Sequence, residues 1–305
     1  MIDILLATYN GERYIETQIR SLQAQTYGQW RLLVHDDGST DHTLDIVRRL
    51  AADDARISLL DDGVQFHSAA QNFLHLIRHS TAPFCICCDG DDVWLAPKLE
   101  RLYSEILRHD NARPQAVWCN SYVYDPETCD ISGWASLCIM RELRDVLFCN
   151  GGIQGCAILF NAALRDIVVS RTPAKVAMHD HVLTLAATAF GEFTYVPKRL
   201  MLYRRHSHAV TGHTDRTKAE RASRFMRPGV AVLDRRHYEA TRSFYDANAD
   251  YLPAEAKRLM LRFFDYENHN RLWRALHAPL DGFRLYSRRS YLAMKLLLRP
   301  LVGSI

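Results

Sequence analysis

The chain has 305 residues, which is enough for one large domain or for one domain with an appendage. Its net charge of +3 is too small to indicate a nucleic acid partner, and no stretch approaches the ~20 apolar residues of a membrane span. The 8 cysteines lack the paired spacing of a disulfide scaffold and lie mostly in apolar runs, so we expect a reducing compartment, the cytoplasm. The opening residues, MIDILLATYN, have neither the basic region nor the long apolar region of a signal peptide.

In the first half, apolar runs of strand length alternate with segments of helical periodicity. The expected strands are Ile2–Ala7, Arg31–His35, Ile57–Leu60 and Phe84–Cys88, and the expected helices are Tyr14–Gln25, Asp41–Ala52, Ser68–His79 and Lys98–Arg108. Strands joined through helices imply right-handed crossovers and a mostly parallel sheet. We therefore expect an α/β fold whose ligands bind at the carboxyl ends of the strands.

Polar side chains gather in three of the loops that follow these strands. The loops are Thr8-Tyr9-Asn10, Asp36-Asp37-Gly38 and Asp89-Gly90-Asp91-Asp92. Three carboxylates in four residues repel one another, and Mg²⁺ or Mn²⁺, which prefer oxygen ligands, would relieve that repulsion. The alternatives are a solvated acidic turn before a helix that starts at Pro97, and helix capping by the adjacent aspartates of the second loop. No GxGxxG or GxxxxGK[ST] follows the first two strands, which excludes a dinucleotide fingerprint and a P-loop there.

Three sequence blocks together resemble a family 2 glycosyltransferase of the GT-A fold. They are ATYNGERYIETQIRSLQAQTY, LLVHDDGSTDHT and CDGDDVWLAPKL, and the resemblance covers roughly residues 2 to 210. The family implies inverting transfer of a sugar from a nucleoside diphosphate to an acceptor hydroxyl. The form DGDDVW is similar to bacterial polysaccharide and rhamnosyl transferases. That similarity implies a UDP- or dTDP-sugar donor and a lipid-linked glycan acceptor, as in O-antigen or capsule synthesis.

The resemblance also implies roles for residues in the three loops. Ala7, Tyr9 and Asn10 would border the nucleotide base, and Asp37 would bond it. Asp89-Gly90-Asp91 matches the family's DXD motif, whose acids hold the metal, Mn²⁺ or Mg²⁺, and the ribose or diphosphate. Asp92 extends the motif. We expect it near the acceptor together with Trp94, Gly155 and His179.

The second half supplies the expected acceptor side. Gln115–Val123 and Ala157–Phe160 read as strands, and the glycines before the latter, Gly155 among them, would let an acceptor approach or would simply make a flexible turn. Asp180 precedes an expected helix, Val182–Phe190, where an aspartate is a good N-cap. The resemblance puts the general base here, and an inverting displacement needs such a carboxylate to take the acceptor proton.

Basic and imidazole side chains follow in the segment LYRRHSH, at residues 202–208. The family often has a Tyr-Arg-x-His element at this place. Arg204 would then offset the charge of the diphosphate, and His206 would bind the metal or a phosphate. The alternative is a basic loop over the site.

Beyond about residue 215 the resemblance ends. We therefore divide the chain into a GT-A domain, residues 1–215, and a helical C-terminal extension, residues 216–305. The expected helices of the extension are Lys218–Phe225, Val230–Asp246, Pro253–His269 and Asp281–Leu298. From Arg271 to Arg299 there are seven lysines or arginines and one acid, so the last helix would either lie on an anionic membrane or dock on the protein with its arginines outward.

The sequence therefore predicts a metal-dependent inverting glycosyltransferase, cytoplasmic or peripheral on the inner face of the cell membrane. A sugar-phosphate nucleotidyltransferase is a second possibility, but Tyr9-Asn10-Gly11-Glu12 is a poor phosphate loop for one. A phosphoacceptor receiver domain would be far shorter than this chain. A binding-only subunit would not need to keep every acid that catalysis requires.

Overall fold

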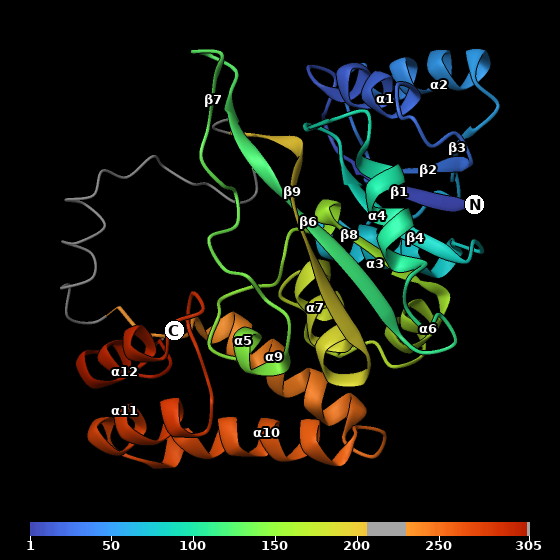
Figure 1. Ribbon diagram of the computed structural model, residues 1–305. Helices are drawn as coiled ribbons and strands as arrows, with labels where there is room; N and C mark the ends of the chain where they lie inside the picture. Colours follow the sequence, from blue (N-terminus) through green and yellow to red (C-terminus); the bar gives the residue numbers. More distant parts are fainter. Residues whose placement is uncertain (206–229, 304–305) are drawn as a thin grey trace.

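The computed structural model describes residues 1–205 and 230–303. Within them, strands form one mixed sheet in the order β3-β2-β1-β4-β8-β6-β9-β5, with β7 paired to β6 (Figure 1). The parallel part of the sheet comprises β1 (Ile2–Thr8), β2 (Trp30–Asp36), β3 (Ile57–Leu59) and β4 (Phe84–Asp89). The connecting helices are α1 (Ile15–Gln23), α2 (Thr43–Asp53) and α3 (Ala69–His79).

The second half of the sheet adds an antiparallel strand and then returns to the first direction. Its strands are β5 (Val93–Trp94), β6 (Gln115–Asp125), β7 (Asp130–Ser132), β8 (Ile158–Asn161) and β9 (Glu192–Arg204). Because β8 is antiparallel to both β4 and β6, and β9 is parallel to β6, the strands β1–β4, β6 and β9 all point the same way. The predicted α/β fold with a mostly parallel sheet is thus confirmed.

Helices cover both faces of this sheet. The helices of this half are α4 (Lys98–Ile106), α5 (Leu143–Val146), α6 (Ala162–Ser170) and α7 (His179–Phe190). Helices α3, α6 and α7 contact one another on one face, whereas α1 and α2 contact each other on the opposite face (Figure 1). β1 is buried on both faces: its apolar residues Ile4, Leu5 and Leu6 are fully enclosed, and so is Asp3, which pairs with Arg31.

The C-terminal part consists of helices around an aromatic cluster. These are α9 (Arg235–Asn248), α10 (Ala254–Asp265), α11 (Arg271–Leu280) and α12 (Arg289–Leu298), with a 3-10 turn at Tyr266–Asn268. Phe148, which follows α5, packs edge-on against Phe263 and Phe283, so the extension shares its core with the sheet domain. The predicted boundary at residues 215 and 216 and the predicted helix Lys218–Phe225 lie outside the described residues.

One prediction for the extension is wrong. Asp281–Leu298 is not a single helix, because residues 281–288 form a turn and only Arg289–Leu298 is helical. Gly282, Tyr286 and Ser287 have φ angles of +87°, +52° and +60°, which a helix cannot contain. The sequence reading also missed α11. Among the described residues, no helix is both long enough and apolar enough to cross a membrane.

Candidate active site

The three polar loops meet at one edge of the sheet, as predicted. In the register of the parallel strands, Ala7 pairs with His35 of β2 and with Asp89 of β4. The first two loops are also joined by hydrogen bonds, since the backbone N–H of Asn10 donates to Ser39 Oγ at 2.8 Å and its side-chain oxygen accepts from the N–H of Thr40 at 2.8 Å. Tyr9 remains 59% exposed beside them, so its ring is accessible to a ligand.

The two acids after β2 are both engaged by backbone N–H groups. Asp36 accepts from the N–H groups of Gly38 and Ser39 within its own loop. It does not cap α2, whose N-cap is His42, so the helix-capping alternative is wrong. Asp37 is 4% exposed, and its carboxylate accepts from three successive N–H groups, those of residues 66, 67 and 68, at 2.5–3.0 Å. The sequence did not predict that Asp37 would bind the backbone of residues 66–68. Asp37 positions the loop before α3, and its contact with a nucleotide base stays a prediction.

The same loop is held by a second cluster of side chains. Asp62 lies 2.6 Å from Nε2 of His75 and 3.3 Å from Nε2 of His35, whose Nδ1 lies 2.7 Å from the Asn72 side-chain oxygen. These bonds tie residues 60–68 to β2 and α3. The loop beside the predicted base site is therefore anchored at both ends.

The acidic loop after β4 brings two of its three carboxylates, those of Asp89 and Asp92, together beside the Cys156 thiol. Ligand atoms of Asp89, Asp92 and Cys156 lie within 4.8 Å of one another. Burial, together with the charge of Asp91, raises the pKa of Asp89 to about 6 and that of Asp92 well above its usual range. One oxygen of Asp92 accepts from the N–H of Arg204 at 3.2 Å, and the other is buried with no partner among the described residues.

This loop fits a hard divalent cation. Crowded carboxylates with raised pKa values gain from a positive charge, and the carboxylate oxygens are suitable ligands for Mg²⁺ or Mn²⁺. The Cys156 thiol is a soft donor and does not suit either ion. Of the predicted metal ligands, Asp89 belongs to this cluster, Asp91 lies in the loop but not in the cluster, and His206 lies outside the described residues. Asp92, which was predicted near the acceptor, belongs to the cluster instead.

Arg204 lies against the acidic loop, and its contact with a diphosphate stays a prediction. Its Nε donates to the backbone oxygen of Asp91 at 2.6 Å, and its guanidinium stacks 4.5 Å from the ring centre of Tyr14. The side chain is 7% exposed, so these contacts fix its position. A rigid cation beside the acids can meet a diphosphate there.

A buried lysine beneath the loop was missed by sequence reasoning. Lys98 is fully buried; its Nζ donates to the backbone oxygen of Cys156 at 2.7 Å and lies 3.4 Å from the ring centre of Trp94. Its positive charge lowers the pKa values of Asp89 and Asp92 and offsets part of their repulsion. The sequence did offer a signal for this burial: Lys98 follows DGDDVWLAP and is followed by apolar helix positions. A lysine among apolar positions is buried only if its charge has a partner.

Asp180 faces this acidic loop from α7. Burial raises the pKa of Asp180 to about 7, and the negative charge of Asp89 contributes to the rise. The helix begins at His179 with Met178 as its N-cap, so the alternative reading of Asp180 as a mere N-cap is wrong. It lies in the first turn instead, where the N–H of His181 bonds its carboxylate and holds part of the rise back. A carboxylate that titrates near neutral pH suits a general base.

Three predictions for the acceptor side need correction. His179 offers an acceptor almost no surface, because its ring is 4% exposed, stacks on Phe73 at 3.9 Å, and has its pKa lowered to about 3 by burial. Trp94 is 2% exposed and offers no surface to an acceptor. Gly155 is neither an acceptor platform nor a flexible turn, since a Cβ there would lie 2.1 Å from Nε2 of His179. Glycine is required for this close approach.

Comparison with known proteins decides the family. The model of the family described as "Glycosyl transferase family 2" matches residues 3–167, more than half of the chain. The chain belongs to this family. It is 35% identical over 111 residues to the "UDP-Glc:alpha-D-GlcNAc-diphosphoundecaprenol beta-1,3-glucosyltransferase WfgD" of Escherichia coli, covering 36% of this chain and 42% of that protein. It is 27% identical over 229 residues to the "dTDP-rhamnosyl transferase RfbG" of Shigella flexneri, covering 70% and 76%.

Solved structures agree on the GT-A fold. TarS of S. aureus superposes with a TM-score of 0.59 at 15% identity, covering 86% of this chain and 70% of the other. The mannosyltransferase PcManGT of Pyrobaculum calidifontis, solved with GDP-Man and Mn²⁺, gives a TM-score of 0.52 at 17% identity, covering 97% and 85%. The chain spans 42% to 63% of the length of the first curated relatives.

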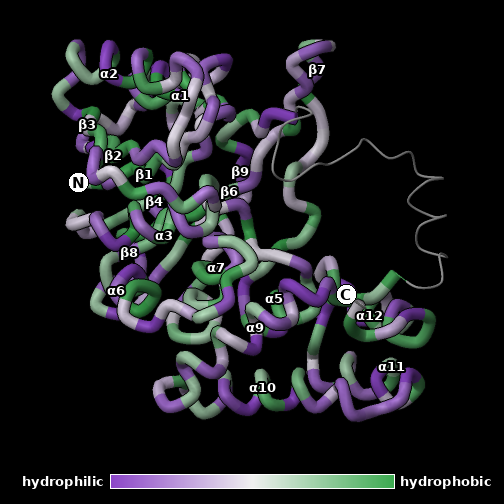
Figure 2. Tube along the Cα trace, turned by 180° about the vertical axis from the view of Figure 1, so that it is seen from behind, coloured by the Kyte–Doolittle hydropathy of each residue, from purple (hydrophilic) through white to green (hydrophobic). Residues whose placement is uncertain are grey.

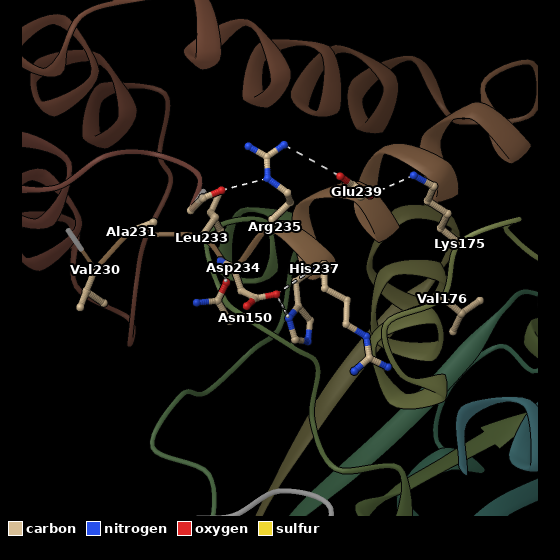
Figure 3. Close-up of a pocket in the computed structure, with 12 residues that line it drawn as sticks. Asn150, Lys175, Val176, Val230, Ala231, Leu233, Asp234, Arg235, His237 and Glu239 are labelled. Atoms are coloured by element: carbon tan, nitrogen blue, oxygen red, sulfur yellow. Dashed lines mark hydrogen bonds and ion pairs between the residues drawn. The ribbon is translucent and has the colours of Figure 1, made fainter. Parts of the chain in front are cut away.

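The glycosyltransferase also has a cavity of about 800 Å³ away from these acids (Figure 3). It lies between the start of α9 and the segment before α7, and ion pairs such as Lys175–Glu239 cross its rim. None of the described residues predicted for the active site lines it. It borders the start of α7 through His237, whose ring lies 5.4 Å from that of His181, and through Arg236, which donates to the backbone oxygen of Ala177.

Proposed function

We propose that this glycosyltransferase transfers a hexosyl or rhamnosyl group, with inversion, from a UDP- or dTDP-sugar to a hydroxyl of a glycan acceptor. The acceptor we propose is lipid-linked and serves bacterial surface polysaccharide synthesis at the inner face of the cell membrane. The names of the relatives WfgD and RfbG support this choice of donors, and WfgD's name includes a diphosphoundecaprenol acceptor.

The observation that carries the proposal is the position of Asp180 opposite the acidic loop. Asp180 lies on α7 and Asp89 ends β4, yet the two are close enough for the charge of Asp89 to raise the pKa of Asp180. An inverting displacement needs a base on the far side of the sugar from the leaving diphosphate. In this arrangement Asp180 takes the acceptor proton while the new glycosidic bond forms and the bond to the diphosphate breaks.

The remaining residues hold the donor. Asp89 and Asp91, with His206, would hold Mn²⁺ or Mg²⁺, which when bound supplies positive charge to the departing diphosphate. Arg204 adds a fixed cation beside the loop. Ala7, Tyr9, Asn10 and Asp37 lie together at the ends of β1 and β2, where we place the base and ribose.

A panel of nucleotide sugars tests this proposal. UDP-glucose, UDP-GlcNAc, dTDP-rhamnose and GDP-mannose are each added with Mn²⁺, Mg²⁺ or EDTA, and both the melting temperature and the release of nucleoside diphosphate are measured. We expect one donor to raise the melting temperature and to be hydrolysed slowly, with metal only. Formation of pyrophosphate from a nucleoside triphosphate and a sugar phosphate would instead support a nucleotidyltransferase, and no response to any donor would support neither enzyme.

A further inference from the structure

Helix α11 exposes a stripe of leucines. Leu272, Leu276 and Leu280 recur every four residues and are 62%, 57% and 78% exposed, while Ala278 on the other side of the helix is fully buried. Residues spaced by four share one helix face. Single exposed leucines are common, but three in line on one helix form an apolar face that lacks a partner within the described structure.

Helix α12 packs against α11 and extends this apolar surface. Its residues Leu292 and Leu296 are fully buried, so the helix is docked on the protein. Its other face exposes Met294, Leu297 and Leu298 by 43–47%. Figure 2 shows α11 and α12 side by side at the end of the molecule away from β1–β3, with hydrophobic residues along both. We call these six exposed residues of α11 and α12 the apolar end.

The charges around the apolar end are positive. Among the described residues, Arg271, Arg288 and Arg289 are exposed and take part in no ion pair. The nearest acid in sequence, Asp281, is already bonded to Arg262. The other cations of this segment are held within the protein, and of these Arg284 pairs with Glu142 and Asp145. Three free arginines, not seven basic residues, are therefore the charge available to a partner.

We propose that the apolar end, with Arg271, Arg288 and Arg289, binds the surface of an anionic lipid bilayer. Leucines would enter the boundary between headgroups and acyl chains, and the arginines would meet the lipid phosphates. Tyr286, 44% exposed and 5.6 Å from the ring centre of Tyr291, suits the same interface, where one end of the ring is apolar and the other polar. Helices of 10 residues are too short to span a bilayer and long enough to lie on it.

The apolar end is connected to the catalytic half of the enzyme. In the turn between α11 and α12, the N–H of Arg284 donates to the backbone oxygen of Arg144 at 3.3 Å, and Ser287 Oγ donates to that of Ile139 at 3.4 Å. Ile139, which this bond joins to the turn, and Leu137 are themselves 38% and 66% exposed. Helix α5 follows this loop and contacts α7, which carries Asp180. The binding surface stands on this geometry, and only its purpose, reaching a lipid-linked acceptor, rests on the proposed function.

Flotation of the full chain with vesicles tests the surface directly. The vesicles contain either phosphatidylglycerol with phosphatidylcholine or phosphatidylcholine alone, in a series of salt concentrations. The apolar variant replaces Leu272, Leu276 and Leu280 by Gln, and its matched control is Leu107→Gln, an equally exposed leucine on another face. The charge variant is Arg288→Gln with Arg289→Gln, and its control is the exposed Arg48→Gln.

We expect the wild type to float with anionic vesicles and to be released by salt. Each lost leucine should weaken the partition coefficient about tenfold, and each lost arginine about fivefold, while both controls behave as wild type. Flotation of the leucine variant at the wild-type level, or no flotation of the wild type, would overturn the proposal. So would a wild-type dimer that the leucine variant converts to a monomer, because a second copy would then cover the stripe. Since flotation needs no donor or acceptor, it does not depend on whether the proposed activity is correct.

Discussion

Replacing Asp180 by Asn should have opposite effects on activity and on stability. The change keeps the size of the side chain but removes its charge and its ability to accept a proton. Turnover should fall about 10²-fold or more, the usual scale for loss of a general base. Binding of the nucleoside diphosphate should change little, because Asp180 lies on a different element from the donor residues.

The effect on stability follows from the raised pKa of Asp180. The pKa of Asp180 rises from its ordinary 3.8 to about 7 in the folded protein. Because each pKa unit corresponds to about 1.4 kcal/mol, ionisation of Asp180 destabilises the folded state by about 4 kcal/mol. This is an upper limit, since part of the side chain keeps contact with solvent. Below pH 3.8 both states are protonated and the penalty is absent. The penalty grows as the pH rises from 3.8 to about 7, because Asp180 then ionises in the unfolded state but not in the folded state. Above about pH 7 the penalty is complete.

The assay compares wild type and Asp180→Asn in activity and in melting temperature at pH 4.5 and pH 8. At pH 8 the variant should lose turnover about 10²-fold or more and melt several degrees higher than the wild type; at pH 4.5, where the penalty has only begun to develop, its advantage should shrink to about 1 kcal/mol. Asp53→Asn, at an exposed aspartate, serves as the control and should show neither effect. A variant with near wild-type turnover would show that the base lies elsewhere, and an equal melting temperature at pH 8 would show that the charge of Asp180 is not penalised.

Three further substitutions test the surroundings of the base. Asp91→Ala should abolish transfer and leave the melting temperature unchanged or higher, because it removes one of three repelling carboxylates; full wild-type activity in EDTA would refute the metal assignment. Gly155→Ala should cost about 1–3 kcal/mol of stability through its clash with His179, whereas Gly28→Ala, with open space around it, should be tolerated; equal melting temperatures would contradict the contact. Trp94→Phe should lower stability and leave the acceptor KM unchanged, and a raised KM alone would restore Trp94 to the acceptor site.

Local sequence patterns were sufficient to predict which edge of the sheet carries the residues proposed to bind the donor. Apolar runs gave the strands, and each acidic loop directly follows one, so the parallel register alone brings Asp37 and Asp89 to the same edge. Arg204 could be placed because it too ends a strand. Such predictions depend only on periodicity within a segment and on the rule that parallel strands end together.

The errors concern contacts between segments far apart in the chain. Trp94 stands beside acids in the sequence, yet its side chain points into the core toward Lys98, and nothing local reveals this. His179 flanks a polar residue but packs on Phe73, more than a hundred residues earlier. In the tail, the helical pattern of residues 281–298 was interpreted without the positive φ angles of Tyr286 and Ser287, which only a tertiary contact such as Ser287 to Ile139 explains.

The separation of the proposed base from the donor acids depends on one short segment. Cys156 bonds Asp89 through its thiol, and the preceding Gly155 lies directly against the ring of His179, next to Asp180. Since a side chain at Gly155 would push α7 away from β4, the absence of a Cβ there sets how closely the two halves of the site approach. The burial of His179 then fixes the first turn of α7 in that position. Gly155 and His179, which sequence reasoning assigned to the acceptor, thus contact each other between Asp89 and Asp180, the carboxylates to which the resemblance assigned the chemistry.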